Sequence, residues 1–174
     1  MRKFTVLIDQ SGKIEDMSMD TGMAFSQEKN KSDEVSESIH IKKEHKSRLK
    51  PLAKEALGST EKFRLKLFAC GIFMLTQNYV GGLKEIVIDQ EYEGKDNLIE
   101  TYLGNFYENN MQLERSKFPK ITVDRISSRI EGTPECHDLA YRARELSIEP
   151  LFVSNYKFLK GMVLPSPGKG RKTN

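Results

Sequence analysis

The chain has 174 residues, of which 37% are hydrophobic and 30% are charged. These values are typical of one soluble globular domain, and no apolar run approaches the roughly 20 residues that a membrane-spanning helix needs. The first apolar run is too short for a signal peptide, so we expect a cytoplasmic protein with no membrane partner. The net charge of +3 permits nucleic-acid binding without requiring it.

The N-terminal third is expected to form strands. Phe4 to Ile8 is apolar enough for a central strand, and residues 21–26 are the next candidate. Residues 35–41 alternate between apolar and polar side chains, which is the pattern of a half-exposed strand. Three successive strands predict an antiparallel start to the sheet.

Helices and strands are expected to alternate in the rest of the chain. In order, we expect a helix at 43–57 broken by Pro51 and Gly58, a core helix from Ser59 or Thr60 to about 78, a strand at 83–88, a helix at 97–107, a strand at 121–124 and a helix from 133 to 146. Asn97 with Glu100 resembles a capping box, and Thr133 with Pro134 is typical of a helix start.

These strand–helix–strand passages predict right-handed crossovers, and therefore a mixed sheet with helices on its faces. Residues 153–164 are expected to add a short strand or an irregular segment. Residues 1–164 would then form one domain, and residues 165–174 a flexible basic tail.

Acidic residues follow the predicted strands and occur in the last helix. Asp9 follows the first strand, Asp89 ends the strand at 83–88 with Glu91 two residues on, and Asp138 lies one turn into the last helix. Carboxylates that emerge at one edge of a sheet can converge on a divalent metal ion. The pattern predicts a metal-dependent enzyme acting on phosphates, with Asp124 as an additional candidate ligand.

Each acid also has an ordinary structural explanation. Asp9 before Ser11 and Gly12 is typical of a tight turn, and Asp89 could be a loop acid. Asp138 in a first helical turn favours the helix dipole whatever its function. The joint occurrence of these acids at element ends favours the metal site.

Three short segments carry a resemblance to a known superfamily. Asp9-Gln10-Ser11 is similar to an Asp-x-Ser at the end of a first strand, Ile88-Asp89-Gln90-Glu91-Tyr92 to a fourth-strand Asp-Ser-x-Tyr, and Asp138-Leu139-Ala140 to an Asp-Leu-Ala in a last helix. Together with the element order, they resemble the ribonuclease H-like superfamily from about Phe4 to Leu146. The resemblance implies an α/β fold with a mixed five-stranded sheet flanked by helices.

The same resemblance implies a nuclease. Such a hydrolase would cleave RNA, an RNA–DNA hybrid or DNA by a two-metal mechanism with Mg²⁺ or Mn²⁺. By position, Asp9 would bridge the metals, Asp89 would hold the nucleophile side and Asp138 the other side. His137 is a candidate for assisting proton transfer, although a lone histidine is more commonly a surface residue.

One expected acid is not clearly present. Cleaving members of the superfamily carry a Glu early in the central helix, and this position falls near Arg64. Glu61, one turn earlier, or Glu91 could replace it. A missing acid would lower metal affinity and could mean lost activity.

The remaining patterns are less specific. Cys70 and Cys136 show no zinc-ligand spacing, and Cys70 is expected to be a small buried hydrophobic residue. Basic residues crowd the stretch from 42 to 54, which is either a solvated helix face or a nucleic-acid contact.

Three functional hypotheses follow. The first is the metal-dependent nuclease, and the second is a catalytically inactive ribonuclease H-like domain that binds nucleic acid or a protein partner. The third, a nucleotide- or small-molecule-binding α/β protein, is disfavoured because the chain has no glycine-rich phosphate-loop motif. The substrate, the biological process and the oligomeric state stay open.

Overall fold

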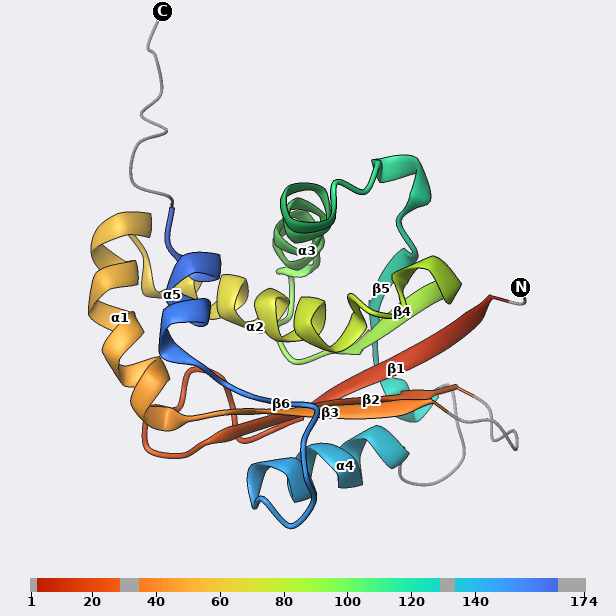
Figure 1. Cartoon of the computed structure of the whole chain (residues 1–174), viewed down its shortest axis with the longest axis horizontal. Helices are drawn as coiled ribbons and strands as arrows, with labels where there is room; N and C mark the ends of the chain where they lie inside the picture. The colour runs from red at the N-terminus through yellow and green to blue at the C-terminus, as the bar shows by residue number, and fades with distance from the viewer. Residues whose placement is uncertain (1–2, 29–34, 129–133, 166–174) are drawn as a thin grey trace, which may run out of the picture.

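The computed structural model describes residues 3–28, 35–128 and 134–165. Within them, six strands form one mixed sheet in the order β5-β4-β1-β2-β3-β6 (Figure 1). The strands are β1 (Phe4–Ser11), β2 (Thr21–Gln27), β3 (Ser36–Ile41), β4 (Leu83–Asp89), β5 (Lys120–Asp124) and β6 (Phe152–Val153). The first three strands pair antiparallel, whereas β4 is parallel to β1 and β5 is parallel to β4. The predicted mixed α/β sheet is confirmed.

Helices cover both faces of this sheet. α4 (Glu135–Arg144) packs on one face, mainly against β2 and β1, and the other helices lie on the opposite face (Figure 1). These are α1 (Lys43–Leu57), α2 (Thr60–Thr76), α3 (Asp96–Met111) and α5 (Tyr156–Val163). Three short 3-10 helices, η1 (Val80–Gly82), η2 (Arg115–Lys117) and η3 (Ile126–Ser128), complete the described elements. β4 and β5 are joined through α3, as a parallel connection requires.

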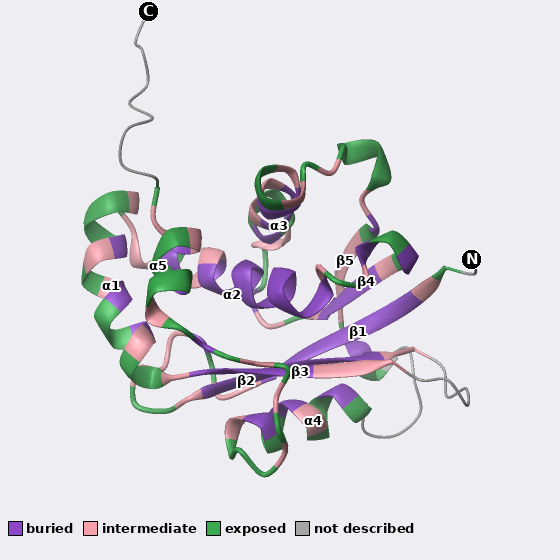
Figure 2. Ribbon diagram, viewed as in Figure 1, coloured by how far each residue is buried: buried purple, intermediate pink, exposed green. Residues whose placement is uncertain are grey.

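α2 lies at the centre of the larger hydrophobic core. It contacts α1, α3 and α5 as well as the sheet, and its side chains are buried on nearly every side (Figure 2). A helix enclosed by protein in this way has to be apolar all round, which is the pattern that its sequence shows. The face under α4 carries a smaller cluster that contains Leu7, Val87, Ile126 and Cys136.

The sheet has six strands where five were predicted. The additional strand, β6, has two residues and pairs in parallel with β3 at Ile39 and His40. A strand this short has no detectable alternation, so its pairing depends on contacts distant in the sequence. Most of the segment 153–164, predicted as a short strand or an irregular segment, instead forms the helix α5, whose N-cap Asn155 accepts a hydrogen bond from the Phe158 amide at 3.2 Å.

Two helix predictions need correction. α1 continues through Pro51, where we expected a break, and ends before Gly58, which has a left-handed φ of 68°. Burial of Leu49 and Ala53 on either side of the proline holds the helix together despite the missing amide donor. α3 begins at Asp96, so Asn97 is inside the helix and does not form the predicted capping box.

The start of α4 also differs from the prediction. Pro134 is the N-cap residue rather than the first helical residue, and the predicted cap Thr133 lies outside the described residues. The helix ends at Arg144, and Leu146 adopts a positive φ of 53°. The predicted basic tail also lies outside the described residues, apart from Pro165.

No helix in the described ranges combines the length and the apolar character that crossing a membrane requires. Both cysteines are buried and unpaired with each other, and Cys70 packs in the larger core as expected.

Candidate metal centre

Asp9 and Asp89 lie side by side on neighbouring parallel strands. Leu7 of β1 pairs in register with Val87 of β4, and each aspartate stands two residues further along its strand. Because side chains alternate between the faces of a sheet, each aspartate points to the same face as the residue two positions before it. Leu7 and Val87 pack with Cys136 of α4, so both carboxylates face the α4 side of the sheet.

The end of β1 was not placed correctly by the sequence, which predicted it before Asp9. β1 continues to Ser11, because it stays paired with β2 after its neighbour β4 has ended at Asp89. Asp9 is therefore a residue within a strand, opposite Ala24, and the turn that could have explained it begins further on.

Glu91 joins the two aspartates through a tight reversal after β4. Its amide donates to the Asp89 carbonyl at 2.8 Å, which folds the chain back at the strand end. Asp9, Asp89 and Glu91 then each present a carboxylate oxygen, and these three oxygens lie within 4.8 Å of one another. Asp9 is 7% exposed, and the other two are half-buried.

Hydrogen bonds fix the orientation of both aspartates. The Gln10 amide donates to Asp9 Oδ1 at 2.7 Å, and His137 Nδ1 lies 2.7 Å from Asp9 Oδ2. An ionised Asp9 requires the imidazole to be the donor in that contact. Asp89 Oδ1 accepts from the amide of Ile126, which begins η3, at 2.9 Å.

The surroundings of Asp9 and Glu91 disfavour the ionised form of these two side chains. Burial raises the pKa of Asp9, the charge of Asp89 raises it further, and the hydrogen bonds from His137 and Gln10 oppose these effects. Burial also raises the pKa of Glu91, helped by the charges of Asp9 and Asp89 and opposed by a Gln10 hydrogen bond and by Lys13. A cation among the three oxygens would relieve this cost.

Asp138 is not part of the group. Its side chain is 64% exposed and lies 3.6 Å from Arg142 on the same helix. Successive residues of an α-helix point about 100° apart, so a helix that turns His137 toward Asp9 turns Asp138 away from it.

Glu61 and Asp124 also lie outside the group found among the described residues. Glu61 makes ion pairs with Lys95 at 3.0 Å and with Arg64 at 3.7 Å. Asp124 ends β5 opposite Asp89, and its Oδ1 accepts from the Arg125 amide at 2.8 Å.

Arg64 takes part in a polar network on the other side of β1. Its guanidinium lies 4.9 Å from the centre of the Tyr92 ring and 3.8 Å from Glu15, and the Tyr92 hydroxyl donates to Glu15 at 2.9 Å. The Gln10 side chain donates to the Tyr92 hydroxyl at 3.4 Å, so Gln10 connects this network to the acidic group.

Some contributors could not be found from the sequence. The Ile126 amide acts through the backbone, 37 residues away from Asp89, and no residue type marks such a donor. The sequence singled out Gln10 only as the middle residue of Asp9-Gln10-Ser11. In the structure, its backbone amide donates to the Asp9 carboxylate. A hollow of about 250 Å³ lined by Gln90, Glu91, Glu93 and Arg125 opens next to the group.

No protein-family profile matches the chain, and no curated protein has a similar sequence. The geometry of the acidic group is therefore the basis for assigning a function.

Proposed function

We propose that the protein is a divalent-metal-dependent nuclease of ribonuclease H-like fold. The observation that carries the proposal is the convergence of Asp9, Asp89 and Glu91 from β1 and the end of β4. The order of the first five strands and of the helices between them supports the superfamily resemblance. Phosphodiester hydrolysis is the reaction class that this resemblance implies.

The donor set fits Mg²⁺ or Mn²⁺. These hard cations prefer carboxylate oxygens, and neither sulfur nor a cluster of imidazoles is present in the group. The raised pKa values of Asp9 and Glu91 show that the negative charge is poorly compensated by the protein alone. A bound divalent ion would supply an activated water molecule and charge neutralisation at the phosphate.

Other groups of the chain orient the metal-binding carboxylates, and one of them can transfer a proton. His137 and the Gln10 amide hold the two oxygens of the Asp9 carboxylate, and the Ile126 amide holds Asp89. The His137 side chain is 58% exposed, so its ring connects Asp9 to solvent. We assign His137 the transfer of a proton between the site and bulk water.

The group provides ligands for one ion. Only one set of three converging ligand residues occurs among the described residues. The resemblance implies a second ion, which would need further oxygen ligands. These could come from the substrate phosphate, or from Asp138 if its side chain moved away from Arg142. We therefore propose one ion held by the protein alone, with a second ion bound only with substrate.

The second candidate is a ribonuclease H-like domain that has no catalytic activity. Arg64 stands near the position where cleaving members carry a Glu, and its charge is paired with Glu15 and Glu61 rather than directed at a metal. A domain that binds nucleic acid or a protein partner without cleaving would fit this feature. Nucleic-acid binding that weakens steeply with salt but needs no divalent ion would favour it.

A cleavage assay separates the two candidates. Protein stripped of metal is given Mn²⁺ or Mg²⁺ and labelled single-stranded RNA, RNA–DNA hybrid or DNA. We expect metal-dependent cleavage that falls by more than about 100-fold in Asp9→Asn, since losing a ligand costs more than losing an outer-shell partner. Glu55→Gln, an exposed acid on α1, is the matched control. Absence of cleavage of every substrate, or full activity in Asp9→Asn, would refute the nuclease proposal.

A further inference from the structure

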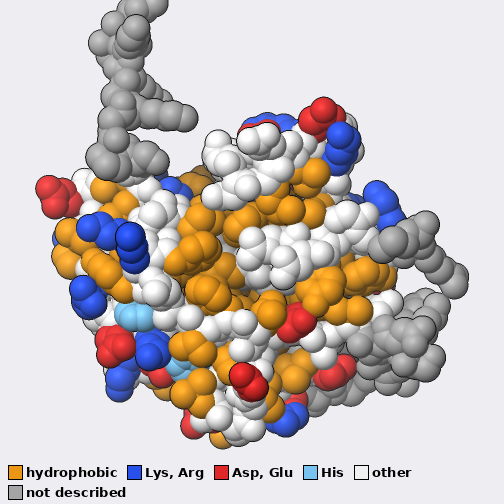
Figure 3. Space-filling view, viewed as in Figure 1, with side chains coloured by type: hydrophobic (Ala, Val, Ile, Leu, Met, Phe, Trp, Pro, Cys, Tyr) orange, Lys and Arg blue, Asp and Glu red, His pale blue; other side chains and the backbone are white. Residues whose placement is uncertain are grey.

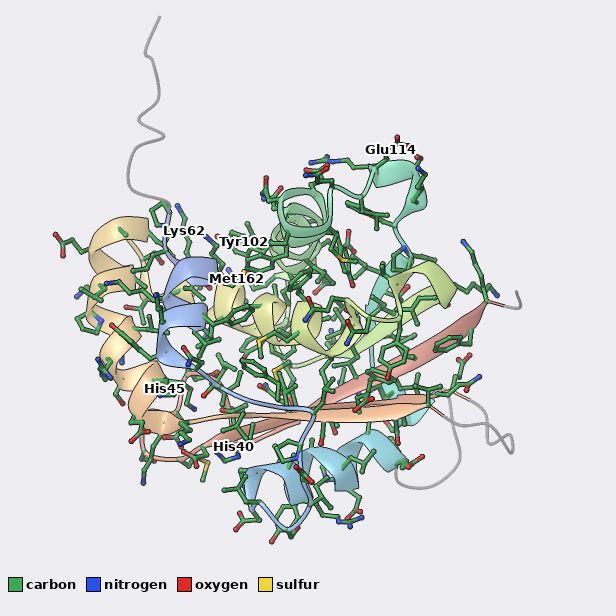
Figure 4. All side chains as sticks on the ribbon, viewed as in Figure 1. His40, His45, Lys62, Tyr102, Glu114 and Met162 are labelled. Atoms are coloured by element: carbon green, nitrogen blue, oxygen red, sulfur yellow. The ribbon has the colours of Figure 1, made fainter. Side chains whose placement is uncertain are left out.

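A second candidate site lies on the opposite side of the sheet from α4. A hollow of about 540 Å³, which is within the usual size of small-ligand sites, is formed by α2, α3, α5 and the residues that follow α5. Figure 4 shows Tyr102 and Met162 close together above α2, and both line this hollow. Hydrophobic side chains cover much of the surface between α5 and α3 (Figure 3).

Gly161 of α5 keeps the hollow open. It also lines an adjoining hollow of about 510 Å³, which shares Asn110 and Met162 with the first. A Cβ built on Gly161 meets no atom within 4 Å, so a larger side chain there would enter the shared space without disturbing the packing. Glycine inside a helix is unfavourable to stability, and here it borders both hollows, which together we call the groove.

The groove is positively charged. Lys66 of α2 lines the larger hollow and Lys157 of α5 lines the smaller one, while no carboxylate occurs among the described lining residues of either. Lys66 makes no ion pair within the described part of the chain, and burial lowers its pKa. A half-buried ammonium group without a counter-ion is suited to bind an anion.

The other lining groups suit a planar, hydrogen-bonding ligand. Asn105, Asn109 and Asn110 offer amides, which both donate and accept hydrogen bonds. The Asn110 side chain is held in place because it donates to the Phe106 carbonyl at 2.9 Å. The half-exposed ring of Tyr102 provides an aromatic surface on which a base could stack.

We propose that this groove binds a nucleotide, with its phosphate at Lys66 and its base against Tyr102. The ligand is either a free nucleotide or one unit of a single-stranded nucleic acid, since both present the same phosphate and base. The chain lacks a glycine-rich phosphate loop, so recognition here is by side chains. The site is separate from the acidic group, because Asp9 and Asp89 face α4 on the other side of the sheet.

Binding to the full chain in EDTA tests this proposal independently of the metal centre. The probes for calorimetry are adenosine monophosphate, adenosine, inorganic phosphate and a short single-stranded oligonucleotide. We expect the monophosphate to bind more tightly than adenosine or phosphate alone. Lys66→Gln should weaken the monophosphate about tenfold, through loss of one charge-assisted hydrogen bond, and leave adenosine unchanged.

Substitutions on α5 provide the steric test and its control. Gly161→Trp should abolish binding without lowering the melting temperature, and Lys160→Gln, on the same helix but outside the lining, should bind as the parent protein does.

The probes also identify the ligand. Binding of the oligonucleotide alone would identify one unit of a single strand as the ligand, and binding of the monophosphate would identify a free nucleotide. If Gly161→Trp does not fold, the affinity of Lys66→Gln for the monophosphate tests the proposal instead. The proposal is overturned if no probe binds at millimolar concentration, or if neither substitution weakens binding.

Discussion

Asp9 is a nearly buried carboxylate whose neighbours include two further acids. Its oxygens are held by His137 and by the Gln10 amide, yet burial still raises its pKa above the ordinary value of 3.8. In the pH range between the ordinary and the raised pKa, the folded protein binds more protons at this site than the unfolded protein does. The contribution of Asp9 to stability therefore falls as the pH rises through this range and stays low above it.

In a chelating buffer, the Asp9→Asn variant should gain stability relative to the parent protein as the pH rises from about 4 to 7, because the amide carries no charge to desolvate. Urea unfolding of both proteins across this pH range measures the difference. A difference that is independent of pH would show that Asp9 does not titrate with a raised pKa.

The sequence predicted which acids to consider but not how their side chains are oriented. Asp9, Asp89 and Glu91 could be selected because they follow or end apolar strand patterns. Asp138 was preferred to its neighbour His137 as a ligand, and the structure turns His137 toward Asp9 instead. The rotation of a helix about its axis is set by tertiary packing, which a local pattern does not record.

The packing of α4 against the sheet depends on Gly22 of β2. A Cβ at this position would come within 1.9 Å of the Ala140 carbonyl oxygen and 2.7 Å of the Arg144 amide nitrogen, both in α4. The absence of a side chain lets α4 lie close to the sheet, and this position places His137 beside Asp9.

We therefore expect Gly22→Ala to displace α4 and to destabilise the protein by about 1–3 kcal/mol, the usual cost of overpacking. Affinity for Mn²⁺ should also fall, since the hydrogen bond from His137 to Asp9 would be lost. Gly81→Ala is the matched control, because its added Cβ meets nothing within 4 Å. Unchanged stability in Gly22→Ala would show that α4 does not depend on this contact.

A second link between elements is the buried side chain of Lys46 in α1. Its ammonium donates to the Lys13 carbonyl at 3.2 Å, the Asp16 carbonyl at 2.6 Å and the Thr21 hydroxyl at 2.8 Å. These bonds fix the β1–β2 connection, and burial lowers the Lys46 pKa to about 8. A lysine with a lowered pKa reduces stability below that pKa, and the loss is recovered as the pH rises toward its ordinary value of 10.5.

Lys46→Met should nevertheless destabilise the protein by about 2–4 kcal/mol at neutral pH, because buried acceptors would lose their donor. Thermal unfolding measures the effect, with Lys54→Met as the control because Lys54 is exposed on the same helix. Equal melting temperatures for the two variants would contradict the structural role of Lys46. The basic stretch predicted a solvated face or a nucleic-acid contact, and it did not distinguish this one buried lysine from its exposed neighbours.

The mixed sheet and its helical layers follow from patterns that the sequence contains. Strands of five or more residues and the long apolar α2 were predictable, because each is an apolar or alternating run of suitable length. The pairing of β6 with β3 and the continuation of α1 through Pro51 were not, since both depend on contacts made after the chain folds. The same limit applies to the metal centre, where acids from β1 and β4 meet an amide donor from η3.

Calorimetric titration of the metal-free protein with Mn²⁺ at neutral pH tests whether Asp9, Asp89 and Glu91 form a metal centre. We expect about one Mn²⁺ per chain, with binding lost in Asp9→Asn and retained in Asp138→Asn, whose carboxylate lies outside the group. No binding by the parent protein, or equal binding by Asp9→Asn, would contradict a metal centre at Asp9, Asp89 and Glu91.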